Sequence, residues 1–344
     1  MQYTDPSLTA LFKEQFEWCK LKTNESAAII TEADSREQYA QAAQSAIAAL
    51  GARPFQVMLP SKANIKHEVP SAGRGTPTQI LDNFPEIVDL LKNINFVVDL
   101  SVGNLIHSKM GAEIRKGGAR TLLIKEPPEA LARLMPTDER RIRIDQAVER
   151  MTKAEEMVIT SDAGTNLKVD LSNSKAQGAY GFCDKPGSSA TWATCAVLTY
   201  PKSLNVNGDV VLAIGDIVFP FYRYVESVVT LKFKNGFVEE IIGQGLDTEL
   251  IIDYFARWKD KNAYGISHVG WGLHERAIWD ALTFYSRNEA AGVDGRSFEG
   301  NFLISTGPNH VAGRYSDCHF DIPMRNCTIH LDGEPVVVKG KVVN

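Results

Sequence analysis

Two His-x-Asp triplets near the end of the chain could hold a metal ion: His319-Phe320-Asp321 and His330-Leu331-Asp332. In an extended segment, residues i and i+2 point to the same side, so the imidazole and the carboxylate can share one cation. Two histidines and one carboxylate on one face of an octahedron leave three adjacent positions open for substrate and O₂, as in non-haem Fe(II) oxygenases. Each triplet lacks one histidine for such a site, although the same pattern also occurs as a structural or surface feature.

Turn residues separate the two triplets. Asp332-Gly333 lies between the strand-like segments 328–331 and 335–340, which indicates a tight hairpin. The Asp332 carboxylate is more simply used to hold that turn. Asp321 instead precedes Ile-Pro-Met, with no turn residue beside it. We therefore favour His319 and Asp321 as ligands.

A third ligand could come from His268, which lies in SHVGWGLH (267–274). Gly270 and Gly272 flank the tryptophan of this segment, and glycine lets the backbone approach a ligand closely. A histidine packed beside a turn is the alternative interpretation of the same segment.

Two further residues could serve such a site. Ser305 begins a polar, glycine-rich loop at 304–313, where it could point an oxygen inward, although N-cap and turn roles are commoner for serine. His107 follows the strand-like segment 94–101 and opens a predicted helix. Open α/β sheets bind ligands at the carboxyl ends of their strands, so His107 is a candidate acid or base. An exposed histidine in a first helical turn is the alternative.

The elements that must position these residues divide the chain in two. In the first part, strand and helix patterns alternate, which predicts a parallel sheet in a doubly wound α/β domain. Strands are predicted at 27–34, 54–60, 94–101 and 120–127, and helices at 35–51 and about 105–116.

The pattern changes after Pro127 and Pro128. A polar helix is predicted at 136–157, and alternating strand patterns follow it, with hairpin signals at Asn235-Gly236 and Asp332-Gly333. We therefore expect an α/β domain at 1–135 and a mostly antiparallel, β-rich, metal-binding domain at 136–344.

Composition excludes several classes of protein. The 344 residues are 44% hydrophobic and 23% charged, with a net charge of −5, so no basic surface for nucleic acid is indicated. No run approaches the roughly 18 apolar residues that a membrane span needs, and no signal peptide is indicated at the start. We expect a cytoplasmic protein without membrane partners. The five cysteines form no CxxC pair, which argues against a disulfide framework or a zinc knuckle.

Three segments carry a resemblance to a known family. SHVGWGL, NFLISTGPN (301–309) and CHFDIPM (318–324) occur in this order in the last quarter of the chain. Together they resemble the 2,5-dihydroxypyridine 5,6-dioxygenases, which are related in fold to aminopeptidase T-like metallopeptidases. The layout of an α/β domain followed by a β-rich domain agrees over most of the length.

The resemblance implies a non-haem iron, extradiol-type dioxygenase of nicotinate or pyridine degradation, acting in a homo-oligomer. It implies that Fe(II) is the cofactor and is bound by His268, Ser305, His319 and Asp321, with His107 as the catalytic residue that moves protons. The substrates would be a small aromatic N-heterocycle and O₂. For 2,5-dihydroxypyridine the product would be N-formylmaleamate.

The chain departs from the family in one loop. Where the family has a second catalytic histidine after its Pro-Gly pair, this chain reads KPGSSATWATCAV (185–197). We expect Thr191 or Trp192 to fill that space and, with Ile106, to contact the substrate. A close hydroxylated N-heterocycle is then the alternative substrate. The alternative function is a metal-dependent aminopeptidase, but His268 replaces a carboxylate of the two-metal site, which removes a group that bridging needs.

Overall fold

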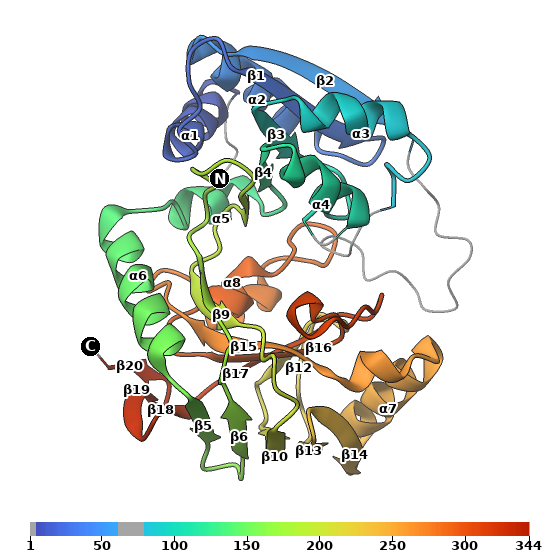
Figure 1. Ribbon diagram of the computed structural model, residues 1–344, viewed down its shortest axis with the longest axis vertical. Coiled ribbons are helices and arrows are strands. Elements are labelled where there is room, and N and C mark those ends of the chain that lie inside the picture. The colour runs from blue at the N-terminus through green and yellow to red at the C-terminus, as the bar shows by residue number, and fades with distance from the viewer. Residues whose placement is uncertain (1–4, 61–78, 107, 344) are drawn as a thin grey trace.

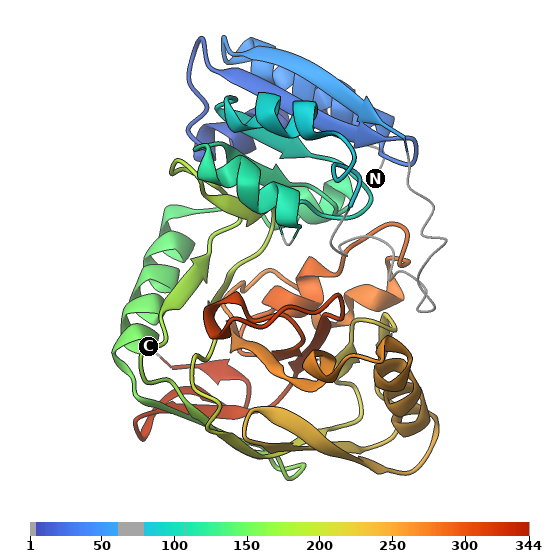
Figure 2. The same cartoon turned by 45° about the vertical axis from the view of Figure 1, so that its right-hand side comes forward.

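The computed structural model describes residues 5–60, 79–106 and 108–343. An α/β unit lies at one end of the molecule and a β-rich unit at the other (Figure 1). Helix α6 (Asp138–Lys153) runs from the first unit along the side of the second (Figure 2). The predicted fold class, an α/β domain followed by a mostly antiparallel β domain, is confirmed. No helix in the described part of the chain has the length and apolar character that a membrane span requires.

The α/β unit is built on five parallel strands in the order β2-β1-β3-β4-β8. Ala27 and Ile29 of β1 share a core with α1 and α2, whereas Ala28 and Ile30 pack with α3 and α4 on the other face. Helices therefore cover both faces, so the strands are apolar on both sides, as the doubly wound prediction requires. The elements are α1 (Asp5–Trp18), β1 (Ser26–Glu32), α2 (Glu37–Ala49), β2 (Arg53–Leu59), α3 (Pro85–Lys92), β3 (Phe96–Asp99), α4 (Lys109–Lys116), β4 (Arg120–Leu123) and β8 (Ser189–Thr191).

Strand β8 lies in the second half of the chain, beyond the predicted domain boundary at residue 135, but it belongs to the sheet of the first unit. It pairs in parallel with β4, through Leu123 and Thr191, at the edge of the α/β sheet. Phe182, Cys183 and Trp192 enter the core of the same unit. The segment 182–193 therefore belongs to the α/β unit, although it follows the first strands of the β-rich unit. A strand of three residues is too short to give a recognisable pattern, which is why sequence reasoning missed it.

The β-rich unit consists of two antiparallel sheets over one apolar core. Ile159 and Val169 come from the larger sheet, and Val269 and Ile304 come from the smaller one. The larger sheet has the order β14-β13-β10-β6-β5-β18-β19-β20, and the smaller has the order β17-β16-β15-β9-β7. The larger sheet contains β5 (Glu156–Thr160), β6 (Asn166–Asp170), β10 (Val206–Leu212), β13 (Val229–Lys234), β14 (Phe237–Gly243), β18 (Thr328–Leu331), β19 (Glu334–Val338) and β20 (Lys341–Val342). The smaller contains β7 (Ala176–Ala179), β9 (Ala196–Thr199), β15 (Ile266–Gly272), β16 (Phe302–Thr306) and β17 (Phe320–Met324).

Shorter elements complete the two units. They are α5 (Pro128–Arg133), β11 (Ile217–Val218), β12 (Arg223–Tyr224), α7 (Leu246–Trp258), α8 (Val293–Ser297) and the 3₁₀ turns η1 (Lys261–Tyr264), η2 (Trp279–Thr283) and η3 (His310–Ala312). All five cysteines are buried and unbridged, in agreement with the absence of a disulfide pattern.

Both predicted hairpins are confirmed. Asn235 and Gly236 have φ of 49° and 77°, and Asp332 and Gly333 have φ of 49° and 87°. These left-handed values match the turn that joins two strands of right-handed twist. The Asp332 carboxylate accepts backbone N–H groups just before and at the start of β5, at 2.8 to 3.2 Å. It is therefore committed to holding the backbone, and the second His-x-Asp triplet is structural.

Buried polar contacts join the two units. Glu126, just beyond β4, accepts hydrogen bonds from the backbone N–H groups of Ala291 (3.0 Å) and Val293 (3.1 Å). Arg133 of α5 makes two hydrogen bonds to the Asp294 carboxylate, at 2.7 and 2.9 Å. The carboxyl edge of the parallel sheet therefore faces the segment around α8.

Glu126 should make the stability of the protein depend on pH. Burial, and next the nearby Asp294 carboxylate, raise the pKa of Glu126 from 4.5 to about 7. Because the folded pKa is the higher one, this contribution to stability is complete below about pH 4.5 and is lost as the pH rises through about 7. The loss amounts to about 3 kcal/mol of unfolding free energy.

The test is Glu126→Gln, whose amide oxygen can still accept both N–H groups but carries no charge. Urea unfolding at about pH 5.5 and about pH 8.5 should show a smaller loss of stability for this variant than for the natural chain. Glu149→Gln, at an exposed carboxylate of α6, is the control and should behave like the natural chain. Equal pH dependence in all three proteins would contradict the assignment.

Candidate metal centre

Three neighbouring strands of the smaller sheet carry the candidate ligands. Ser305 of β16 lies directly opposite Asp321 of β17. Directly opposed residues of an antiparallel pair point to the same face. His319 precedes Asp321 by two residues, so it points to that face as well. His319 and Asp321 are predicted to point to the same side, and the extended backbone at β17 gives the reason.

A β-bulge brings His268 to the same face. Ile266 pairs with Thr306 and Val269 pairs with Ile304, so both Ser267 and His268 stand opposite the single residue between those partners. In a regular ladder, His268 would lie opposite Ile304, on the face that packs into the core. The extra residue shifts the alternation by one position, which turns His268 toward the face of Asp321.

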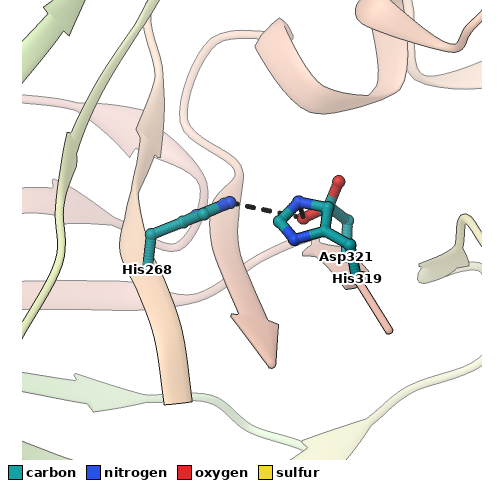
Figure 3. A group of neighbouring side chains, drawn as sticks. All are labelled: His268, His319 and Asp321. Atoms are coloured by element: carbon teal, nitrogen blue, oxygen red, sulfur yellow. Dashed lines mark ion pairs between the residues drawn. The ribbon is translucent and has the colours of Figure 1, made fainter. Parts of the chain in front are cut away.

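The three side chains converge on one point. Nε2 of His268 lies 3.4 Å from Oδ1 of Asp321, and Nε2 of His319 lies 3.1 Å from the same oxygen. In Figure 3, His268 of β15 reaches toward the Asp321 carboxylate from one side, and His319, just before β17, lies next to Asp321. One ligand atom from each residue lies within 4.8 Å of the others. His268 and Asp321 are only 5% and 3% exposed, whereas the His319 side chain is 23% exposed and forms the open side of the group.

The protonation states suit a cation. Burial lowers the pKa of His268, against the opposing effect of Asp321, and so favours the neutral imidazole. Burial alone would raise the pKa of Asp321, but His319 and Arg296 outweigh it and hold that pKa well below its usual range. Neutral imidazole and ionised carboxylate are the forms that bind metals. Buried Oδ1 of Asp321 accepts no hydrogen bond from the described residues, so this oxygen, with two nitrogens beside it, fits a divalent ion.

Comparisons with known proteins agree with this geometry. A family model described as 2,5-dihydroxypyridine 5,6-dioxygenase matches residues 7–344. A curated protein of that name from Pseudomonas putida KT2440 is 35% identical over 350 residues, which cover 100% of this chain and 98% of the relative. The chain belongs to the 2,5-dihydroxypyridine 5,6-dioxygenase family. The resemblance inferred from the three sequence segments is thus confirmed, and the protein is a dioxygenase.

Solved structures support the same assignment. The 2,5-dihydroxypyridine dioxygenase from P. putida KT2440 superposes with a TM-score of 0.93 at 34% identity, covering 99% of this chain and 98% of that one. AmpT from Thermus thermophilus superposes with a TM-score of 0.64 at 14% identity, covering 98% and 99%, which shows a shared fold alone. A metal cofactor accords with the dioxygenase family, and the His268, His319 and Asp321 group could hold it.

Ser305, the predicted fourth ligand, lies on the same face of the sheet as Asp321. Its side chain is fully buried on the face of Asp321. Among the described residues, the contact found for its hydroxyl is a long one, 3.5 Å to the carbonyl oxygen of Thr306. The hydroxyl oxygen therefore keeps lone pairs for another partner. Direct ligation by Ser305 remains a prediction.

The glycines of β15 have a different role from the predicted one. A Cβ on Gly270 would lie 1.9 Å from the carbonyl oxygen of Val197, and one on Gly272 would lie 2.3 Å from that of Phe298. Both glycines therefore admit neighbouring backbone, which is a structural reason for glycine at these two positions.

The predicted substrate contacts come from the α/β unit. Half-buried Ile106 and Thr191 follow β3 and end β8, at the carboxyl edge of the sheet. Trp192 is 0% exposed, and its ring lies 5.1 Å from that of Phe12 in the core, which argues against direct substrate contact by the indole. His107 lies outside the described residues.

Sequence reasoning missed two neighbours of the centre. Nε of Arg296 donates to Oδ2 of Asp321 at 2.6 Å, and the ring of Tyr200 meets that of His268 edge-on with centroids 5.5 Å apart. Neither residue lies in a motif that marks it. Arg296 lies in α8, directly after the loop that Glu126 holds, and it reaches Asp321 from there.

Removing a ligand should remove the metal. In His319→Ala and Asp321→Ala, one of three converging donors is lost, so affinity for a divalent metal should fall by at least about a hundredfold while the fold persists. Metal content after anaerobic loading and gel filtration measures this. His330→Ala is the matched control from the structural triplet and should keep its metal, and near-normal occupancy in both ligand variants would reject the site.

Proposed function

We propose that this dioxygenase binds one Fe(II) through His268, Ser305, His319 and Asp321 and opens the ring of 2,5-dihydroxypyridine with O₂, yielding N-formylmaleamate. The observation that carries the proposal is the convergence of two imidazoles on one oxygen of the buried Asp321 carboxylate. Two histidines and one carboxylate form the donor set typical of non-haem Fe(II) oxygenases. Bound Fe(II) would supply the path by which electrons pass from the ionised ring to O₂.

The chain's own residues supply position and protons. Ile106 and Thr191, at the carboxyl edge of the α/β sheet, would contact the ring from the side opposite the metal ligands. Because Glu126 at this edge contacts the loop before α8, the edge faces the β-rich unit that holds the ligands. Holding ring and O₂ in fixed orientation would then provide much of the rate enhancement.

His107 is the proposed acid and base. It lies in sequence between Ile106 and Ser108, and Ser108 caps α4 by accepting the N–H of Gly111 at 2.9 Å. A histidine there would remove the proton of the ring hydroxyl and return it after cleavage. This residue type suits the task because its ordinary pKa lies near neutral pH.

The missing loop histidine bears on the choice of substrate. Residues 185–197 contain none, and Thr191 ends β8 within this segment. A threonine hydroxyl can donate or accept a hydrogen bond but cannot act as a proton reservoir near neutral pH. A close hydroxylated N-heterocycle that needs one proton transfer is therefore the alternative substrate. A cytoplasmic location and a homo-oligomeric state remain predictions.

The rival function is a metal-dependent aminopeptidase. It draws on the fold shared with AmpT, but a two-metal site needs more carboxylates than this cluster offers. Among residues 5–60, 79–106 and 108–343, one group of potential metal ligands is found, and it holds a single carboxylate. One metal per chain is therefore the arrangement favoured by the donor set.

Oxygen-electrode measurements with anaerobically Fe(II)-loaded protein test the function directly. We expect uptake of O₂ with 2,5-dihydroxypyridine or with one member of a panel of hydroxylated pyridines, and one iron per chain by metal analysis. Two zinc ions per chain with release of amino acids from peptides would favour the aminopeptidase instead.

His107→Ala should separate proton transfer from metal binding. We expect unchanged iron content and substrate affinity, but a loss of about a hundredfold or more in turnover, the usual scale for one positioned acid or base. Iron content, affinity and turnover are measured on one preparation. Loss of the metal would make His107 a ligand, and unchanged turnover would remove it from the mechanism.

A further inference from the structure

Arg296 makes directed contacts that orient Asp321. Its Nε donates to Oδ2 of Asp321 at 2.6 Å, and its Nη1 donates to the carbonyl oxygens of Ala291 (2.6 Å) and Gly292 (3.4 Å). Its guanidinium carbon lies 3.7 Å from the centre of the Phe219 ring. The planar fork of arginine is suited to such simultaneous contacts, which a lysine cannot reproduce.

The two oxygens of Asp321 consequently face different partners. Oδ2 is taken by Arg296, whereas Oδ1 faces Nε2 of His268 and Nε2 of His319. A carboxylate with two available oxygens can bind a cation through both and so occupy two coordination positions. A charge-assisted hydrogen bond at 2.6 Å opposes that mode, because Oδ2 would have to give it up.

We propose that Arg296 is a positioning residue that restricts Asp321 to coordination through Oδ1 alone, and thereby keeps positions open for substrate and O₂. This inference rests on the metal site of the proposed function. If a six-coordinate metal were held by one oxygen of Asp321, two histidine nitrogens and Ser305, two positions would stay free. Coordination through both oxygens would leave only one.

The surroundings of Phe219 support a fixed position for Arg296. The backbone N–H of Phe219 donates to the carbonyl oxygen of Asp321 at 3.1 Å, so the ring and the carboxylate belong to one unit. A Cβ on Gly292 would lie 2.0 Å from this ring, and one on Gly295 would lie 2.8 Å from it. Glycine at both positions thus lets the ring pack closely beside the start of α8.

Glu126 extends the support into the α/β unit. It accepts the N–H groups of Ala291 and Val293, while Arg296 donates to the carbonyl oxygen of Ala291. The loop before α8 is therefore held from both sides.

The experiment replaces the metal by Co(II), whose visible absorption weakens as the coordination number rises. The natural chain should bind one Co(II). Arg296→Gln removes the charged donor that holds Oδ2, so that Oδ2 can turn toward the metal, and we expect weaker absorption and an affinity about 10 to 100 times lower, the usual effect of losing a group that supports a metal ligand. Arg296→Lys keeps a cation beside Oδ2 and should recover part of both losses.

Arg223→Gln is the matched control. The Arg223 side chain is 28% exposed, like that of Arg296, and it pairs with the buried Asp247 carboxylate in the same unit at 3.3 Å. It should leave the Co(II) spectrum and affinity unchanged. Wild-type values in Arg296→Gln would overturn the inference while leaving the proposed site intact. Failure of the natural chain to bind Co(II) would instead reject the site itself.

A crystal structure of the natural chain with Co(II) tests the same point without relying on the folding of a variant. Only Oδ1 of Asp321 should lie at bonding distance, roughly 2.0 to 2.2 Å. Both oxygens at bonding distance would overturn the inference.

Discussion

One extra residue in β15 is the constraint on which the metal centre depends. The bulge at Ser267 and His268 reverses the alternation of side chains, so that an imidazole joins the face of Asp321 while Val269 still packs against Ile304 in the core. Ile266 and Val269 are three residues apart and both pack in the core, so a regular strand could bury only one of them, and with Ile266 buried it would turn His268 into the core. The bulge satisfies both demands, which is why a site of buried polar groups can stand on a sheet whose other face is apolar.

The sequence predicts the parts of this protein that depend on local chemistry. Asn235-Gly236 and Asp332-Gly333 mark their hairpins because few residues adopt positive φ easily. The spacing of His319 and Asp321 predicts their common side for an equally local reason. The bulge and Arg296 escape prediction, because they depend on strand register and on a loop held by Glu126 of the other unit, and neither leaves a pattern in neighbouring residues.

The position of the centre follows from the way the two units meet. The smaller sheet of the β-rich unit supplies the metal ligands, while the carboxyl edge of the parallel sheet supplies Glu126 and the predicted substrate contacts. Each unit has its own packed core. The α/β unit has a parallel sheet covered on both faces, and the β-rich unit has two antiparallel sheets packed together. Glu126 of the α/β unit holds the loop before α8. The same loop accepts a hydrogen bond from Arg296, which pairs with Asp321 in the β-rich unit.

Strand β8 also constrains the order in which the chain can fold during synthesis. Multidomain chains usually fold from the N-terminus as the ribosome releases them. Here the α/β unit lacks its edge strand, and Phe12 lacks its partner Trp192, until the first strands of the β-rich unit have already emerged. The edge of β4 is thus an unpaired template in the nascent chain. Completion of the first unit must therefore wait until β5, β6 and β7 have emerged, and residues 1–135 expressed alone would lack both β8 and Trp192.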